Sequence, residues 1–244
     1  MPHVTIIIPA RYAATRFPGK PLVELWGKPL IQHVYQRAQQ ARLAQRVIIA
    51  TDDQRITDAV KKFGAEVVMT RADHPSGTDR VAEAAASIQT DIVVNVQGDE
   101  PLIEPGDIDT AVAPLLVEES IPMATLCSPL ETTEELANPN VVKVVFDGAG
   151  NALYFSRLPI PFVRDHGAEA TRYRHIGLYV YRKDFLLHLG QLSPTPLEQA
   201  EKLEQLRVLE HGYKIRVSIV PHTSPGVDTP ADLERLRAMG PPTA

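Results

Sequence analysis

Two patterns of hydrophobic residues alternate along the first half of the chain, one typical of strands and the other typical of helices. A continuous apolar run covers 4–8, and such a run is typical of a parallel strand that is buried on both faces. Further strands are predicted at 47–51, 66–69 and 91–97. Segments with helical spacing of apolar residues separate them, at 30–41, 56–63 and 79–89. This strand–helix order predicts an α/β fold with a mostly parallel sheet between two layers of helices.

The second half of the chain is less regular. Strands are predicted at 123–127, 174–182 and 214–220, and a hairpin joins 141–146 to 152–156 through the turn DGAGN. Helices are predicted over 197–211 and from about Pro230 onward. We expect a single domain over 1–244, with an excursion at 131–195 that carries its own antiparallel strands.

Several helix ends carry recognisable signals. Asp52 or Asp53 is placed to cap the second helix, and Gly64 follows it as a left-handed terminating residue. Thr229 and Asp232 form a capping-box pair around Pro230 at the start of the last helix.

Composition excludes some classes of protein. Hydrophobic residues make up 44% of the 244 positions and the net charge is −5, which favours a globular protein and disfavours a general nucleic-acid binder. The single cysteine, Cys127, permits no disulfide within the chain and no cysteine zinc cluster, and it suits a reducing compartment. No stretch approaches the roughly 20 apolar residues of a membrane span. We therefore expect a soluble, cytoplasmic protein with no membrane partner.

Positive charge gathers on the loop that follows the first strand. The segment PARYAATRFPGKPL contains Arg11, Arg16 and Lys20 and no acidic residue. It matches neither the dinucleotide-binding glycine pattern nor the P-loop. Arginine and lysine side chains can still bind phosphate directly, so the loop favours an anionic ligand. The alternative is a solvated basic loop.

Carboxylates follow a later strand and precede the last helix. Asp99 and Glu100 end the segment VNVQGDEP, and Asp228 lies in GVDTP. Magnesium in proteins is held by one or two carboxylates together with substrate phosphates. Alone, the first pair could be an ordinary turn and Asp228 a residue favoured by the helix dipole. Together with the cationic loop, they indicate a metal–triphosphate site.

A fourth segment, TRADHPSGTDR at 70–80, supplies small residues that let a planar ligand approach the backbone. Its candidates are Arg71, Ser76 and Gly77. The alternative is a polar connection with a helix cap at Thr78. The histidines have no metal-binding spacing, and no serine lies in a nucleophile elbow, so nothing favours covalent catalysis.

A resemblance to the 3-deoxy-D-manno-octulosonate (KDO) cytidylyltransferases, or CMP-KDO synthetases, spans residues 4–237. It is carried in order by PARYAATRFPGKPL, TRADHPSGTDR, VNVQGDEP, NPNVVKVV, ALYFSR, RHIGLYVYR, LEQLRVLEHG and GVDTPADLERLR. The resemblance implies a three-layer αβα nucleotidyltransferase fold and a homodimer. It also implies the Mg²⁺-assisted reaction of CTP with KDO to give CMP-KDO and pyrophosphate for lipopolysaccharide core synthesis.

The same resemblance assigns roles to individual residues. It implies catalytic roles for Arg11, Lys20, Asp99 and Asp228, the last two as magnesium ligands. The implied nucleotide-binding residues are Pro9, Ala10, Arg11, Arg16, Lys20, Arg71, Ser76, Gly77 and Gln97. The implied sugar-binding residues are Gln97, Arg157, His175, Tyr179, Glu204 and Gln205. Tyr179 could instead be packed on a strand face, and Glu204 could lie on a solvated helix surface.

One position departs from the family pattern. Pro75 stands where a polar residue is expected, and proline has no N–H to donate to a base. The mechanism expected from the resemblance is an in-line attack of the sugar 2-hydroxyl on the α-phosphate of CTP, with no residue identified as a general base. The alternatives are a cytidylyltransferase for another sugar acid such as sialic acid, and a non-catalytic nucleotide-sugar binding protein.

Overall fold

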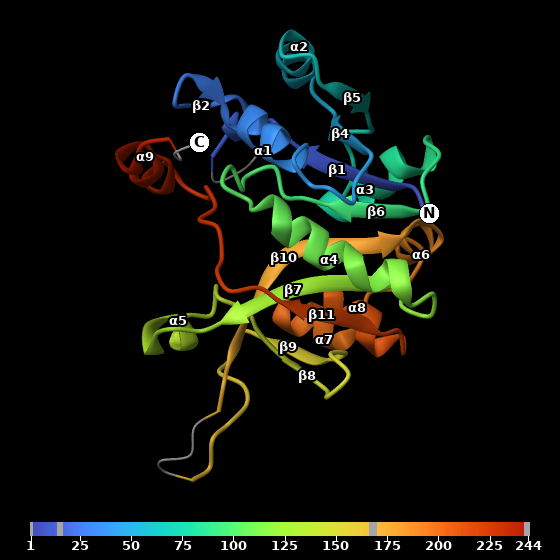
Figure 1. The fold of residues 1–244 in the computed structure, drawn as a ribbon, viewed down its shortest axis with the longest axis vertical. Coiled ribbons are helices and arrows are strands. Elements are labelled where there is room, and N and C mark those ends of the chain that lie inside the picture. Colours follow the sequence, from blue (N-terminus) through green and yellow to red (C-terminus); the bar gives the residue numbers. More distant parts are fainter. Residues whose placement is uncertain (1, 14–16, 166–169, 242–244) are drawn as a thin grey trace. The chain divides into compact units, whose positions relative to one another are not determined.

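The computed structural model describes residues 2–13, 17–165 and 170–241. The chain divides into two compact units, one formed by 1–109 with 224–244 and the other by 110–223. Figure 1 shows the elements with their labels. The excursion expected over 131–195 lies within the second unit, and the single domain expected over 1–244 stays a prediction.

A parallel sheet forms the centre of the first unit. Its strands lie in the order β6 (Ile92–Asn95), β1 (Val4–Ala10), β4 (Arg46–Thr51) and β5 (Glu66–Met69). Ile7 pairs with Ile48 on one side and with Asn95 on the other, both in parallel register. The parallel sheet predicted from the strand–helix order is confirmed.

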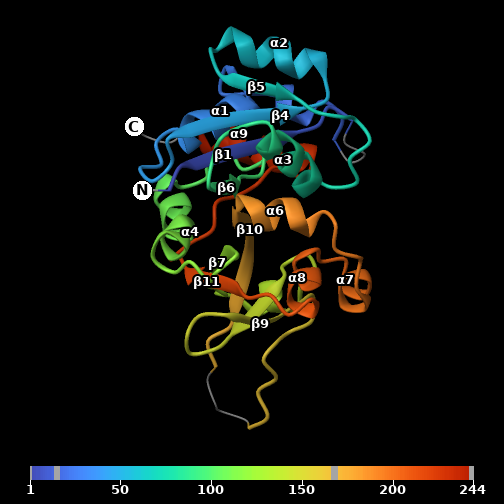
Figure 2. The same ribbon diagram turned by 90° about the vertical axis from the view of Figure 1, so that its right-hand side faces the viewer.

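Helices cover both faces of this sheet. Ile6 and Ile7 are both fully buried, and since successive strand residues point to opposite faces, each face is covered. The helices are α1 (Leu30–Ala38), α2 (Gln54–Lys62) and α3 (Gly77–Ala86). Figure 2 shows α2 beside β5 and α3 alongside β1 and β6.

The helix ends match the sequence signals with one correction. Asp53 caps α2 by accepting a hydrogen bond from the backbone N–H of Arg55 at 2.9 Å, and Gly64 has a φ of 74°. The cap of α3, however, is Ser76 and not Thr78. Ser76 and Asp79 form a reciprocal capping box, which ends the preceding loop two residues earlier than expected.

The C-terminal segment returns to the first unit. Helix α9 (Pro230–Met239) begins at the Thr229–Asp232 capping box that was predicted. Its residues Leu233 and Leu236 share a buried cluster with Leu25 and Leu30. Nearby lie the short helix η1 (Lys20–Leu22) and the strands β2 (Glu24–Leu25) and β3 (Lys28–Pro29). Burial of this cluster anchors the loop that contains Asp228.

A mixed sheet forms the second unit. Strand β7 (Met123–Pro129) pairs in parallel with β11 (Ile215–Ile219) and antiparallel with β10 (Tyr173–Arg182). Strand β8 (Lys143–Phe146) pairs with β10 and, as the predicted hairpin, with β9 (Ala152–Ser156). The antiparallel strands expected in this part of the chain are confirmed.

Four helical features differ from expectation. The helices α4 (Pro105–Val117), α5 (Thr133–Ala137) and α6 (Lys183–Leu189) were not predicted. Helix α4 lacks a clear polar stripe and contains Pro114, and α5 is too short for periodicity. The continuous helix predicted over 197–211 is wrong: α7 (Pro196–Glu201) and α8 (Gln205–Glu210) are separated at Lys202, whose φ is 54°.

No helix within 2–13, 17–165 and 170–241 is both long enough and apolar enough to cross a membrane.

Candidate active site

A pocket of about 230 Å³ lies at the carboxyl ends of β1 and β6 in the first unit. Ligands of α/β proteins characteristically bind at this edge of the sheet. The lining residues are Pro9, Ala10, Arg11, Lys20, Pro21, Gly77, Gln97, Gly98 and Asp99. The structure therefore brings most of the residues expected to bind nucleotide to one hollow.

Gly98 allows the two strand ends to approach each other. A Cβ atom at this position would lie 2.7 Å from the carbonyl oxygen of Pro9, which is closer than non-bonded carbon and oxygen atoms come. The glycine thus sets the width of the pocket at its base. Because β1 and β6 are paired in parallel, this contact also brings Asp99 beside the end of β1.

Arg11 contributes positive charge at the end of β1. Its Nη2 donates hydrogen bonds to the carbonyl oxygens of His74 and Ser76, at 2.8 and 2.6 Å. Burial lowers the pKa of the Arg11 guanidinium, and the nearby charge of Arg80 lowers it further. Two guanidinium groups in one region favour an anion, which would relieve their repulsion.

The beginning of α3 faces the same pocket through Gly77. Backbone N–H groups at a helix N-terminus, together with the helix dipole, favour phosphate. Arg80, one turn further along α3, is fully buried, contacts Thr70, and lies 3.0 Å from an Asp52 carboxylate oxygen. Arg80 was not among the residues predicted from the sequence, although an arginine on the buried face of a predicted helix is a signal of such a role.

Lys20 lies between the two predicted metal ligands. Its Nζ is 2.6 Å from Oδ2 of Asp99 and 3.8 Å from Oδ1 of Asp228. The left-handed Gly19, with a φ of 72°, begins η1 and carries Lys20 into this position. The two carboxylates, 129 positions apart in the sequence by subtraction of their residue numbers, therefore converge on one cation.

Backbone contacts hold Asp228 near Asp99. The N–H of Val227 donates to the carbonyl oxygen of Asp99 at 2.9 Å. The hydroxyl of Ser224 donates to the carbonyl oxygen of Leu102 at 2.7 Å. The Asp228 side chain remains 62% exposed, so it can turn toward a ligand.

The donor set fits a hard divalent cation that is shared with phosphate. Asp99 and Asp228 already converge on a cationic group. No cluster of three or more His, Cys, Asp or Glu side chains in the described ranges is arranged to hold a metal. Burial, together with the charges of Asp99, Asp107 and Asp228, raises the pKa of Glu100 to about 8. This excess of negative charge would be relieved by a cation, and its remaining ligands would be phosphate and water.

Arg71 and Ser76 are not among the residues that line the pocket. The side chain of Arg71 is 68% exposed and lies 3.4 Å from Asp73. Ser76 acts through its backbone carbonyl on Arg11 and its hydroxyl on the capping box. Arg16 lies outside the described residues. The departure at Pro75 falls between the two carbonyls that Arg11 binds.

In the second unit, three of the expected sugar contacts lie together. The rings of His175 and Tyr179 have centroids 5.4 Å apart on β10, on either side of a bulge. Burial raises the pKa of the Tyr179 hydroxyl, and the Glu204 carboxylate raises it further. Tyr179 is thus a proton donor at neutral pH, with Glu204 close to it.

His175 is held neutral. Burial lowers its pKa to about 3. Its Nε2 lies 3.0 Å from Oγ1 of Thr125, and that hydroxyl also lies 2.8 Å from the carbonyl oxygen of Leu178. Because the hydroxyl has one proton to donate to a carbonyl, the ring donates from Nε2, and Nδ1 is left as an acceptor.

Gln205 and Arg157 are the remaining expected sugar contacts in the second unit, and their hydrogen bonding differs. Gln205 is 4% exposed, and its Nε2 has no hydrogen-bond partner, so a ligand oxygen would satisfy it. Arg157 donates to the carbonyl oxygens of Glu201, Pro139 and Lys202, at 2.6, 2.9 and 3.4 Å. Three of its five N–H groups are thereby used within the chain, and two remain for a carboxylate.

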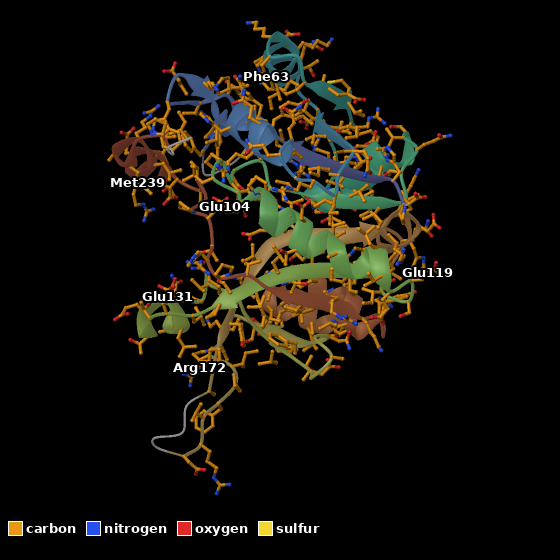
Figure 3. All side chains as sticks on the ribbon, viewed as in Figure 1. Phe63, Glu104, Glu119, Glu131, Arg172 and Met239 are labelled. Carbon is orange, nitrogen blue, oxygen red and sulfur yellow. The ribbon has the colours of Figure 1, made fainter. Side chains whose placement is uncertain are left out.

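A further hollow in the second unit, of about 450 Å³, contains none of the expected sugar contacts. Figure 3 labels two residues that line it, Glu131 beside α5 and Arg172 next to β10. The Nε of Arg172 is buried without a hydrogen-bond partner. The pocket therefore belongs to a different part of the unit from His175 and Gln205.

The model of the cytidylyltransferase family matches residues 5–215. The chain belongs to the cytidylyltransferase family. A curated relative, 3-deoxy-manno-octulosonate cytidylyltransferase of Geobacter metallireducens, is 56% identical over 96% of each chain. The protein of the same name from Syntrophotalea carbinolica is 57% identical, over 96% of this chain and 97% of its own.

Solved structures agree with this membership. A structure of CMP:2-keto-3-deoxy-manno-octonic acid synthetase complexed with CTP has a TM-score of 0.94 and 48% identity, and the match covers 97% of this chain and 98% of that one. A 4-diphosphocytidyl-2C-methyl-D-erythritol synthase from Anaerococcus prevotii, at 12% identity and a TM-score of 0.65, shares the fold. The α/β nucleotidyltransferase fold expected for this cytidylyltransferase is confirmed.

The buried neutral His175 predicts a specific pH dependence of stability. Its folded pKa lies below the unfolded value of 6.5, so the unfolded chain takes up a proton first as pH falls below 6.5. Urea unfolding should show the wild type losing about 1–2 kcal/mol more than His175→Asn between pH 7.5 and pH 5. The exposed His222→Asn should follow the wild type. Parallel curves for wild type and His175→Asn would contradict the buried neutral imidazole.

Proposed function

We propose that this cytidylyltransferase transfers CMP from CTP to 3-deoxy-D-manno-octulosonate, releasing pyrophosphate. The observation that carries the proposal is the convergence of Arg11, Lys20 and Asp99 on one pocket at the carboxyl ends of parallel strands. The identity of the relatives over 96% of the chain supports the choice of sugar.

Triphosphate binding follows from the groups that surround the pocket. Arg11 presents a fixed guanidinium, Lys20 a compact ammonium, and α3 the N–H groups of its first turn. Each would neutralise charge that develops on the departing pyrophosphate, and preorganised donors stabilise such charge strongly. Pro9 and Ala10 line the pocket and would offer backbone carbonyls to the ribose or base.

Asp99 and Asp228 would hold magnesium against the phosphates. When bound, the ion supplies Lewis acidity that polarises the α-phosphate and lowers the pKa of an attacking hydroxyl. The two aspartates fix its place relative to Gly98 and the end of β1. The number of phosphate oxygens that share the ion follows from the substrate and not from the chain.

The second unit would recognise the sugar acid. Two remaining N–H groups of Arg157 suit a carboxylate. Tyr179 donates from a hydroxyl that stays protonated, and the Nδ1 of neutral His175 accepts. Gln205 offers an unpaired buried amide. This mixture of donors and acceptors matches a ligand with one carboxylate and many hydroxyls.

The reaction would be a single in-line displacement without a covalent enzyme intermediate. The sugar 2-hydroxyl attacks the α-phosphorus and loses its proton to solvent. The bond between the α-phosphorus and the oxygen that bridges to the β-phosphate breaks, and pyrophosphate leaves. Cys127, the only thiol, is buried, and burial raises the pKa of its sulfhydryl to about 12. It is therefore an inert core residue and not a nucleophile.

We also propose a cytoplasmic location and a role in lipopolysaccharide core synthesis, where CMP-KDO would be consumed. The single free thiol suits a reducing compartment. Cell fractionation with an antibody against the chain, scored beside a periplasmic marker, would test the location. Recovery of the protein with the periplasmic marker would contradict it.

A homodimer is proposed from the apolar surface of the second unit. Leu158 and Phe162, four residues apart in the segment after β9, are 69% and 87% exposed. Exposed apolar surface can mark a site of interaction with another protein. Sedimentation should give a dimer for the wild type and a monomer for Leu158→Ser/Phe162→Ser. Val117→Ser, also at an exposed apolar position, should remain dimeric. A wild type that is monomeric at all concentrations would contradict the proposal.

Pyrophosphate release tests the proposed reaction. With CTP and Mg²⁺, the purified protein should release pyrophosphate with KDO and not with sialic acid, and Asp99→Ala should lose the activity. Release with sialic acid alone would favour the alternative sugar acid. Binding of CTP without release with either sugar would favour a non-catalytic nucleotide-binding protein.

A further inference from the structure

Lys143 is a fully buried lysine within the apolar strand β8. Its Nζ donates hydrogen bonds to three backbone carbonyl oxygens, those of Asn138, Val141 and Arg157, at 3.0, 2.8 and 2.8 Å. An ammonium has three N–H donors, and all three are used. A buried charge is tolerated only when its hydrogen-bonding groups are paired in this way. Lys143 therefore serves to hold these backbone carbonyls together and is not a solvated surface charge.

Strand register joins Lys143 to Arg157. Lys143 lies opposite Ser156 in the β8–β9 pair, so the next residue, Arg157, emerges beside the lysine. The lysine fixes the carbonyl of Arg157, and the Arg157 side chain then extends to the end of α7. Lys143 and Arg157 thus form a chain of contacts that connects the β8–β9 hairpin to α7.

Arg157 accounts for the break between α7 and α8. In a continuous helix, the carbonyls of Glu201 and Lys202 would accept from N–H groups four residues later. Here Nε and Nη2 of Arg157 bind these two carbonyls, at 2.6 and 3.4 Å. Lys202 takes a left-handed conformation, with φ 54° and ψ 47°. The capture of these carbonyls is the physical reason that a single helix over 197–211 does not form.

The Glu201 carboxylate strengthens the same connection. It accepts from the hydroxyl of Ser156 at 2.8 Å and from the backbone N–H of Arg157 at 2.9 Å. Figure 2 shows β9 beside α8, which lies next to α7. The end of α7 is thereby held at three points along 156–157.

The break places two of the expected sugar contacts. Glu204 is the first residue before α8, and its charge acts on Tyr179. Gln205 follows it, with a buried Nε2 that lacks a partner within the chain. Both side chains would point elsewhere if α7 continued as a regular helix, because each residue adds about 100° of rotation.

We propose that Lys143 is a positioning residue for the sugar acid, acting through Arg157 on the α7–α8 break and so on Glu204 and Gln205. The proposal rests on the proposed function, since it assigns the sugar to this unit. Lys143 itself has no donor left for a ligand. Its effect should therefore appear in sugar recognition and not in nucleotide recognition.

Lys143→Met tests this role because it keeps the length of the side chain and removes its donors. The KM for KDO should rise about tenfold or more, and the KM for CTP should stay within about twofold of wild type. Hydrogen exchange of 196–210 should become faster, which is a readout that needs no activity. The exposed Lys214→Met should change neither.

Ser156→Ala and Glu201→Gln probe the same connection more gently, and they decide the matter if Lys143→Met does not fold. Each should raise the KM for KDO selectively by a few-fold. Equal changes in the KM for KDO and the KM for CTP would overturn the positioning role. Unchanged hydrogen exchange of 196–210 would also overturn it. If the wild type does not use KDO, the proposed function fails, while the exchange data still report on the break.

Lys20 carries a second inference from a separate observation. Its Nζ stands at the point on which the carboxylates of Asp99 and Asp228 converge. Its side chain is only 15% exposed and that of Asp99 is 32% exposed, so this ion pair is partly shielded from solvent. A divalent cation bound by both aspartates would need the same position.

We propose that Lys20 competes with the divalent cation for these carboxylates, so that the metal is taken up together with the triphosphate. Phosphate oxygens would draw Lys20 from Asp99, and the carboxylates would then be open to the ion. This inference rests on the proposed metal site, and it makes the nucleotide-free protein a weak metal binder. The order of binding is set by a single ammonium.

Titration of the nucleotide-free protein with Mn²⁺, followed by the electron paramagnetic resonance signal of the free ion, tests the competition. Lys20→Met should bind Mn²⁺ about tenfold more tightly than the wild type. Arg11→Met removes an equal charge from the same pocket but not the ion pair, and it should stay within about twofold of wild type. Lys20→Met/Asp99→Ala should lose the binding.

Equal affinity in Lys20→Met and wild type would overturn the competition. An equal gain in Arg11→Met would also overturn it, since the effect would then be one of general charge. Neither measurement needs sugar or nucleotide, so a failure of the proposed reaction leaves this result readable.

Discussion

The close approach of β1 and β6 is the constraint on which the candidate active site depends. A parallel ladder brings both carboxyl ends to one edge of the sheet, and Gly98 lets the second strand end turn against the carbonyl of Pro9. Arg11 and Asp99 are then close together in space, although they are far apart in the sequence. Any side chain at position 98 would push the two strand ends apart and widen the site.

Opposite charges balance each other around this edge. Arg11 and Arg80 concentrate positive charge next to the first turn of α3, and Asp52 and Asp79 offset part of it. A few residues away, burial raises the pKa of Glu100, and three neighbouring carboxylates raise it further. The positive side suits a polyphosphate, and the negative side suits the cation that accompanies it. Lys20 lies at the boundary and pairs with the acidic side.

In the second unit, two cationic side chains hold separate segments together by donating hydrogen bonds to backbone carbonyl oxygens. Lys143 and Arg157 together bind the backbone oxygens of residues 138, 139, 141, 157, 201 and 202. Lys143 is fully buried, and all of the acceptors belong to the backbone. Such contacts fix loops more firmly than surface ion pairs do. They also interrupt a helix just before Glu204 and Gln205, two of the proposed sugar contacts.

The sequence by itself determined the elements whose signals are local. The alternation of apolar strand segments with helical periodicity specified the parallel strands, and Asp53, Gly64 and the Thr229–Asp232 pair specified helix ends. Because ligands of α/β folds gather at strand ends, the positions of Arg11, Lys20 and Asp99 could also be predicted.

Tertiary structure decided the rest, because the groups responsible are distant in the chain. Helix α4 has no amphipathic stripe to reveal it. The break at Lys202 depends on Arg157, 45 positions away. The meeting of Asp228 with Asp99 depends on the hydrogen bond from Val227 and on the burial of α9. A local sequence pattern does not show which backbone carbonyl will accept a hydrogen bond from a distant side chain. That pairing is decided only when the chain folds and packs.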